Sequence, residues 1–200
     1  THASTEDVDY KKAIALKGNT SYITTKLNTT VGLNSSLRFK VKRTSSSTKE
    51  DQILFESSYG CIKGVQKDTG KLAISRENFD ITFDYVLPVG QWVNIEIKNP
   101  DNGRNKKYAE LYVNGKLVDR KGDDEKVEGR PLIATTMIPF ERIGSKTNAF
   151  VGYVDDIILT KNKEYASTDT LDNELLILNA LVNDKKVDSS KKEALKALIT

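Results

Sequence analysis

The sequence predicts an all-β protein in which two antiparallel sheets stack as a sandwich. Three observations lead to this fold class. Short runs of alternating apolar and polar residues recur between residues 10 and 162, turn residues separate these runs, and the helical period is almost absent from this stretch. About ten to thirteen short strands with regular turn signals are typical of a β-sandwich or a barrel.

The clearest element is a hairpin over residues 108–119. Ala109, Leu111 and Val113 alternate with polar or aromatic residues, which is the period of a strand with one buried face. Asn114-Gly115 follows, and this pair suits a two-residue turn that needs positive φ twice. Residues 116–118 then run back as the partner strand.

The same reasoning places the other strands. Leu37, Phe39 and Val41 alternate with Arg38 and basic neighbours, which indicates a strand with one solvated face. The remaining expected strands cover a pair within 10–25 around a turn at 18–19, and residues 52–56, 61–66, 72–76, 79–85, 92–97, a strand near 143, and 149–160. Residues 122–131 are charged, and we expect them to be irregular.

Composition excludes several function classes. Of the 200 residues, 38% are hydrophobic and 30% charged, and the net charge of +3 is spread along the chain without a basic arm, which argues against nucleic-acid binding. No apolar run reaches the roughly 18 residues that a membrane span requires. Cys61 is the only cysteine and His2 the only histidine of the sequence. A disulfide framework, a thiolate metal site and histidine-based catalysis are therefore not expected.

The two ends of the chain differ from its middle. Residues 1–9 are polar, and we expect a flexible N-terminus, for which a cloning remnant is one interpretation. After residue 161, leucines recur at helical intervals, and Ser190 and Glu193 form a capping box that opens a further helix. Residues 167–200 are therefore expected to be a short two-helix tail, which either docks on the sandwich or begins a helical module that is cut off at residue 200.

Three motifs in combination resemble a known fold family. They are Gly90-Gln-Trp92, Leu-Tyr-Val-Asn-Gly-Lys at 111–116, and Phe-Val-Gly-Tyr-Val-Asp-Asp-Ile at 150–157. Together they resemble the laminin-G-like, concanavalin A-like jelly roll. This resemblance implies a two-sheet antiparallel jelly-roll sandwich over residues 10–166.

A second set of motifs resembles a narrower group. Residues 53–57, 70–77, 83–88 and 142–148 are similar to the non-catalytic domain of large secreted bacterial β-N-acetylhexosaminidases and lacto-N-biosidases, and the tail is similar to the helical modules called FIVAR. The resemblance implies an ancillary carbohydrate-binding module. It would bind glycans with N-acetylhexosamine or galactose, lie downstream of a catalytic domain, and be secreted or held at the bacterial cell surface. A structural spacer or docking domain without a ligand is the alternative, and protein adhesion is a third.

Five residues are candidates for sugar binding. Arg76, Glu77 and Asn78 enter a loop and offer the planar donors and acceptors that sugar hydroxyls need, with Tyr59 or Tyr85 as the accompanying aromatic residue. A surface salt bridge and a core wall are the structural alternatives for Arg76 and Tyr85. Trp92 could serve as a sugar platform, but its place at the start of a core strand favours core packing.

Asp155 and Asp156 are the candidate metal ligands. If Ile157 and Leu159 point to the core, strand alternation places Asp155 on the same inward face, and a buried carboxylate needs a cation or hydrogen-bond donors. The fold resemblance implies a structural Ca²⁺ near the last strand, with hydrogen bonding or solvent exposure as the alternatives. No strand carries the set of carboxylates that a glycosidase needs, so the chain itself is expected to be non-catalytic.

Overall fold

The computed structural model describes residues 4–6, 13–25, 30–31, 35–76, 79–99, 108–122, 126–127, 130–131 and 138–161. The chain divides into two units, Thr1–Asn162 and Lys163–Thr200, and all described residues belong to the first. All regular secondary structure in the described residues is β-strand, so the predicted all-β class is confirmed. None of the described residues builds a helix that is long and apolar enough to cross a lipid bilayer. The expected C-terminal helices fall outside the described residues.

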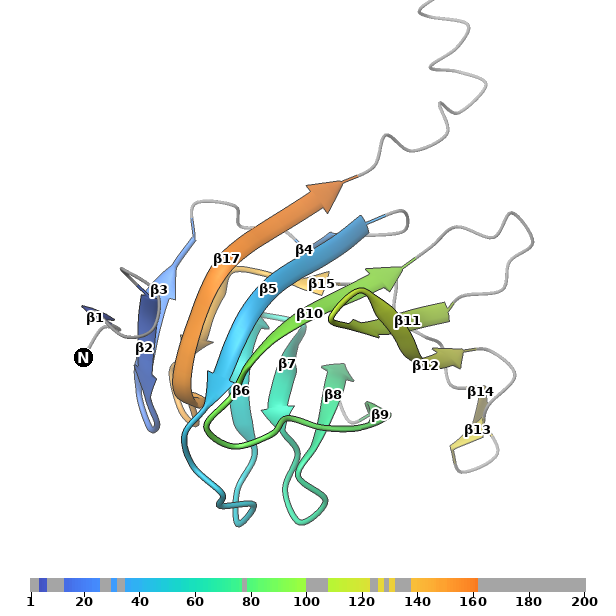
Figure 1. Ribbon diagram of the computed structural model, residues 1–200. Coiled ribbons are helices and arrows are strands. Elements are labelled where there is room, and N and C mark those ends of the chain that lie inside the picture. The colour runs from blue at the N-terminus through green and yellow to red at the C-terminus, as the bar shows by residue number, and fades with distance from the viewer. Residues whose placement is uncertain are drawn as a thin grey trace, which may run out of the picture. The chain divides into compact units, whose positions relative to one another are not determined.

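Two antiparallel sheets form the layers of the sandwich, and Figure 1 shows β17, β5 and β10 lying in front of β6, β7 and β8. The larger sheet has the order β1 (Ser4–Glu6), β2 (Ala13–Lys17), β17 (Val151–Lys161), β5 (Ser35–Arg43), β10 (Trp92–Asn99), β11 (Tyr108–Val113), β12 (Lys116–Gly122). The other has the order β3 (Ser21–Thr24), β16 (Arg142–Ser145), β6 (Gln52–Ser57), β7 (Gly60–Val65), β8 (Lys71–Arg76), β9 (Phe79–Val86).

Four short strands form two additional pairs. Strand β4 (Thr30–Val31) pairs with β15 (Ile138–Pro139), and β13 (Lys126–Val127) pairs with β14 (Arg130–Pro131). The second pair lies within a stretch that we expected to be irregular. At the N-terminus, β1 pairs with β2, so residues 4–6 of the segment expected to be flexible belong to the larger sheet.

Strand alternation fills the space between the sheets. Leu37, Phe39 and Val41 of β5 are fully buried, and Ile95 and Ile97 of β10 pack beside them. Each such side chain contributes about 1.5–3 kcal/mol when it leaves water. On the opposite sheet Phe55 meets Phe39 edge to face, with the ring centroids 4.9 Å apart. The core therefore joins the middle strands of both sheets.

The predicted hairpin is confirmed. Strands β11 and β12 pair in antiparallel register around the turn, where Asn114 has φ 49° and Gly115 has φ 80°. Both values lie in the left-handed region that Asn-Gly turns require. The register shifts once, between Leu111 and Tyr112.

Strand β17 contains a bulge that the sequence analysis missed. Asp156 has φ 47°, and the register with β5 shifts between Asp155 and Ile158. A bulge adds one residue and reverses which residues face the core. Val154 and Leu159 both pack inward, whereas Asp155 shares the outer face with Tyr153. Ile157 and Leu159 pack against the core as expected, but the expectation that Asp155 shares their inward face was wrong.

Candidate ligand-binding groove

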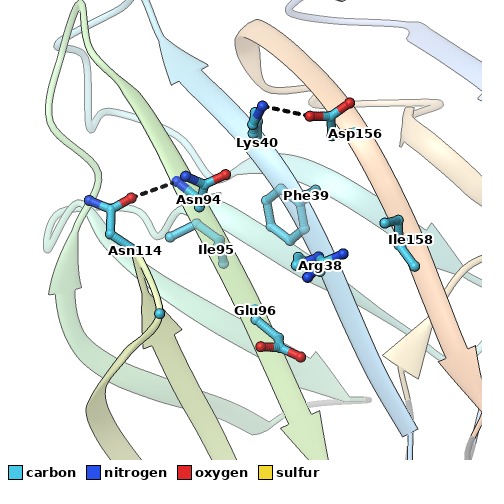
Figure 2. A pocket seen from close by; sticks show the side chains of 10 residues that line it. Arg38, Phe39, Lys40, Asn94, Ile95, Glu96, Asn114, Asp156 and Ile158 are labelled. Atoms are coloured by element: carbon cyan, nitrogen blue, oxygen red, sulfur yellow. Dashed lines mark hydrogen bonds and ion pairs between the residues drawn. The ribbon is translucent and has the colours of Figure 1, made fainter.

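A groove of about 640 Å³ lies on the outer face of the seven-stranded sheet. Strands β5, β10 and β17 form its floor, and the turn after β11 borders it (Figure 2). Phe39 and Ile95 contribute to the floor, although their side chains are buried in the core. The side chains that border the groove are Arg38, Lys40, Asn94, Glu96, Asn114, Asp156 and Ile158.

Strand register arranges these side chains in rows across the sheet. Arg38 on β5 lies opposite Glu96 on β10 and Ile158 on β17. In the next row, Lys40 lies opposite Asn94 and Asp155. Directly opposite residues have Cβ atoms about 5 Å apart, so each row presents a nearly continuous set of functional groups.

Two ion pairs compensate charges in and beside the groove. Lys40 Nζ lies 2.6 Å from Asp156 Oδ2, and Lys98 Nζ lies 3.6 Å from Glu96 Oε2. Arg38 is exposed and forms no ion pair with another described residue. Its guanidinium group is therefore the one cationic group bordering the groove that no described carboxylate neutralises directly.

The two asparagines at the β10 side of the groove are fixed by the backbone. The Asn94 N–H donates to Asn114 Oδ1 at 3.0 Å, and the Asn114 N–H donates to the Asn94 carbonyl oxygen at 2.8 Å. Both residues are exposed. The contact holds the Asn114 side chain at the groove, where its amide NH₂ can donate.

An aromatic pair lies one row beyond Lys40. Trp92 on β10 and Tyr153 on β17 are both opposite Lys42, and their ring centroids are 6.5 Å apart with the planes inclined by 42°. Because Val93 and Ile95 face the core, Trp92 must face outward. The expected core packing of Trp92 was therefore wrong, and its half-buried indole lies on the same face as the groove.

A polar network lies on β11 and β12 beside the groove, and it begins at Tyr112 of β11, which is opposite Glu96 of β10. The Tyr112 hydroxyl donates to Glu110 Oε2 at 3.0 Å, and Arg120 pairs with the other oxygen of Glu110. This hydrogen bond to a carboxylate, with a smaller effect of burial, raises the pKa of Tyr112. Lys98 Nζ lies 4.3 Å from the centre of the Tyr112 ring, a cation–π contact.

The sugar-binding residues expected from sequence lie on the other sheet. Tyr59 is 64% exposed in the turn between β6 and β7, directly before Gly60, which pairs with Arg76. Tyr59 and Arg76 are thus at the same end of the sheet. Tyr85 lies near the other end of β9, where it is half-buried against the core and burial raises its pKa. Glu77 and Asn78 fall outside the described residues.

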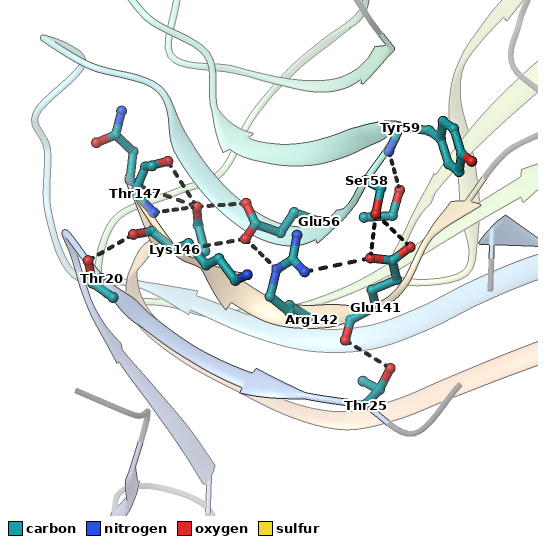
Figure 3. Close-up of polar contacts among 12 residues, drawn as sticks. Thr20, Thr25, Glu56, Ser58, Tyr59, Glu141, Arg142, Lys146 and Thr147 are labelled. Carbon is teal, nitrogen blue, oxygen red and sulfur yellow. Dashed lines mark hydrogen bonds and ion pairs between the residues drawn. The ribbon is translucent and has the colours of Figure 1, made fainter. Parts of the chain in front are cut away.

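A polar cluster beside Tyr59 holds the ends of β6 and β16 together (Figure 3). The buried Glu56 carboxylate accepts from Arg142 Nε at 2.6 Å, from Ser145 Oγ at 2.8 Å and from the Lys146 N–H at 2.9 Å. These contacts occupy the Glu56 carboxylate within the protein. The Tyr59 ring points away from this cluster, so the two features are separate.

The candidate metal ligands occupy the bulge in β17. Asp155 Oδ1 accepts the N–H of Asp156 at 2.8 Å, and Asp156 pairs with Lys40. Among the described residues no three histidine, cysteine, aspartate or glutamate side chains come together as a metal site would require. The burial that motivated the calcium prediction is absent, because both carboxylates lie on the outer face. Calcium binding itself stays an untested prediction.

Comparison with known proteins identifies the fold. No family model and no curated protein sequence matches the chain. Domain 4 of AbnA, a GH43 extracellular arabinanase from Geobacillus stearothermophilus solved with arabinotriose, is 16% identical over 80% of this chain and 75% of that chain, with a TM-score of 0.54. The receptor-binding domain of botulinum neurotoxin type G is 17% identical over 88% and 44%, with a TM-score of 0.49. A variant of human galectin-16 is 12% identical over 70% and 94%, with a TM-score of 0.41. At these identities the likeness concerns the fold alone, and the AbnA match identifies the described residues as a jelly-roll sandwich.

Proposed function

We propose that this domain is a carbohydrate-binding module and that the glycan lies in the groove on the outer face of the seven-stranded sheet. The observation that carries the proposal is the combination of an aromatic pair, Trp92 and Tyr153, with a polar groove on one face. Ligand sites typically combine apolar surface with a few placed polar groups.

The groups at the groove match the chemistry of sugars. Asn94 and Asn114 carry amides, which both donate and accept, and Glu96 accepts. Sugar hydroxyls need donors and acceptors in alternation. The indole of Trp92 offers an apolar face on which the C–H groups of a pyranose can stack. A bound glycan would run along the strands from the aromatic pair into the groove.

The charge pairing favours binding over hydrolysis. Glycoside hydrolysis requires one carboxylic acid that donates a proton and a second carboxylate that acts as base or nucleophile. The two acids bordering the groove, Glu96 and Asp156, each face a lysine ammonium group. Both carboxylates bordering the groove are therefore engaged by ion pairs within the protein.

The sequence motifs suggest the kind of larger protein in which this domain works. We infer that residues 10–166 serve as an ancillary module of a large secreted bacterial glycosidase, β-N-acetylhexosaminidase-like, and hold its catalytic domain near glycans with N-acetylhexosamine or galactose. The AbnA domain, a part of an extracellular arabinanase that was solved with arabinotriose, supports this interpretation through its similar fold.

The alternative, a docking domain without a ligand, calls for a flat apolar face of several hundred Å². Of the large apolar side chains that are exposed in the described residues, Tyr59 lies in a turn and Ile158 beside the groove. Val86 on β9 and Leu117 and Val118 on β12 belong to two strands in contact, where the Asp84 N–H donates to Asp119 Oδ2 at 2.6 Å. A docking role would therefore use the edge formed by β9 and β12, away from the groove.

A glycan array and calorimetric titration of the 200-residue chain test the proposal. Trp92→Ala and Asn94→Ala should weaken binding of any glycan that the chain captures by about tenfold each, because each removes about one kcal/mol or more of stacking or hydrogen bonding. Tyr59→Ala and Arg76→Ala serve as matched variants at the other candidate position. If binding falls with the second pair and not the first, the groove is the wrong site. An array without any signal would contradict carbohydrate binding altogether.

A further inference from the structure

We infer that Arg38 makes the groove select glycans that carry an anionic substituent, a carboxylate or a sulfate ester. This inference rests on the proposed function, because it concerns the ligand of the same groove. It starts from the position of Arg38, which lies on the middle strand of the three that form the groove floor. Its side chain is exposed and reaches the groove from the floor (Figure 2).

The neighbours of Arg38 leave its charge available. Glu96 lies directly opposite Arg38, but its carboxylate pairs with Lys98 at 3.6 Å, and Figure 2 shows it directed away from the guanidinium. Asp156, the other acid bordering the groove, pairs with Lys40 at 2.6 Å. Asp155, in the row of Lys40, accepts a hydrogen bond from its own neighbour's N–H. Within the described residues, the groove thus combines paired acids with an arginine that no acid neutralises.

The chemistry of the guanidinium group points to an oxyanion. Its planar fork of N–H donors fits the two oxygens of a carboxylate or of a sulfate ester in a bidentate contact. Lysine offers only a point charge, and the Lys40 ammonium is already committed to Asp156. On the other side of Arg38, Ile158 is 44% exposed and gives an apolar wall that excludes water from one flank of such a contact.

The spacing of the groove sets the minimum size of the ligand. Trp92 lies in the row of Lys42, and Arg38 lies four residues further along β5. Four residues of a strand extend about 13 Å. A single sugar ring does not reach from the indole to the guanidinium. The ligand is therefore an oligosaccharide that stacks one ring at Trp92 and presents its anionic group to Arg38.

The test compares matched neutral and charged probes on the 200-residue chain. The probes are N-acetyllactosamine, the same disaccharide with a terminal sialic acid, and the same disaccharide with a sulfate ester, each titrated by calorimetry at low and high salt. We expect one of the two charged probes to bind roughly tenfold more tightly than the neutral one, as a charge-assisted hydrogen bond provides. The sialylated and sulfated probes identify which oxyanion fits. High salt should reduce the difference.

Variants separate the role of Arg38 from that of net charge. Arg38→Gln should reduce binding of the charged probe to the level of the neutral probe measured on the same variant. Lys67→Gln removes the same charge from an exposed position on the loop between β7 and β8, and it should keep the preference. Equal binding of neutral and charged probes by the unmodified chain, or a preference that survives Arg38→Gln, would overturn the inference while the proposed function stands. If none of the probes binds and an array also shows no signal, the proposed function and this inference both fail.

Discussion

The Lys40 ammonium group lies 2.6 Å from the Asp156 carboxylate, and this pair connects β5 to the bulge in β17. The contact depends on the bulge, because a regular strand would have placed the residues from 155 onward on alternating faces without interruption. The same irregularity leaves Asp155 on the outer face and Ile157 and Leu159 on the inner one. The bulge at Asp156 therefore determines which side chains of β17 pack in the core and which border the groove.

The bulge predicts the effect of substitutions at Asp156. Asp156→Val should lower the free energy of unfolding by about 1–2 kcal/mol, because a β-branched residue is strained at φ 47°. Asp156→Gly should be tolerated, since glycine adopts this conformation freely and the lost ion pair is 55% exposed on the aspartate side. Urea unfolding of the two variants measures the difference. Equal stabilities would show that the bulge is not retained in solution.

The cluster around Glu56 predicts a large loss of stability. Glu56→Ala should cost about 3 kcal/mol, because it removes the acceptor of the buried Ser145 hydroxyl and of the Lys146 N–H and leaves the largely buried Arg142 guanidinium with only its longer contact to Glu141. Ser58→Ala is the matched control, since the Ser58 hydroxyl makes an exposed contact with Glu141, and it should stay within about 0.5 kcal/mol of the parent chain. Thermal and chemical unfolding would check both. A Glu56 variant as stable as the control would contradict the structural role of this cluster.

The Lys63–Asp80 pair on the six-stranded sheet predicts how stability depends on pH. Burial alone would raise the pKa of Asp80, but hydrogen bonds from Lys63, Ser75 and Gln66 and the Lys63 charge outweigh it, so the pKa lies below its ordinary value of 3.8. A lowered pKa in the folded state stabilises the protein above the ordinary value, and this contribution is lost as the pH falls through the folded value.

Asp80→Asn should therefore cost about 1 kcal/mol at about pH 7, a modest amount because the pair is partly solvated. The difference from the parent chain should shrink as the pH falls from about 4 to about 2. Unfolding titrations of both chains at several pH values measure it. A difference that stays constant through this range would rule out the carboxylate as its cause.

Calcium binding remains open to a direct test. A structural Ca²⁺ held by Asp155 or Asp156 predicts a lower midpoint of thermal unfolding in the presence of a chelator, because a ligand that binds only the folded state stabilises it. Asp155→Asn with Asp156→Asn should abolish the response to calcium. An unchanged midpoint with and without chelator would contradict a structural role for calcium in this domain.

Local patterns were sufficient to predict the longer strands of both sheets. The hairpin around Asn114-Gly115 and the alternation of Leu37, Phe39 and Val41 are encoded in short stretches, and the structure confirms both. The bulge at Asp156 was missed because aspartate tolerates the left-handed conformation without requiring it. The local sequence is therefore equally typical of an uninterrupted strand.

The candidate site could be predicted only in part. The alternation with Val93 and Ile95, which face inward, already placed Trp92 outward. The prediction was wrong because it relied on the place of Trp92 at the start of a core strand. The groove brings together strands that are far apart in the chain, since β5 lies between β17 and β10. Sheet order of this kind depends on the whole fold, and no short motif encodes it.

The two faces of strand β5 have different roles, one in folding and one in the proposed ligand binding. Leu37, Phe39 and Val41 hold the sandwich together, while Arg38, Lys40 and Lys42 alternate with them and lie on the outer side of the sheet. Changes of affinity and changes of folding can therefore accumulate independently along one segment. Such a strand offers a practical place to re-engineer ligand preference, because three consecutive outward positions can be randomised in a library with little risk to the scaffold.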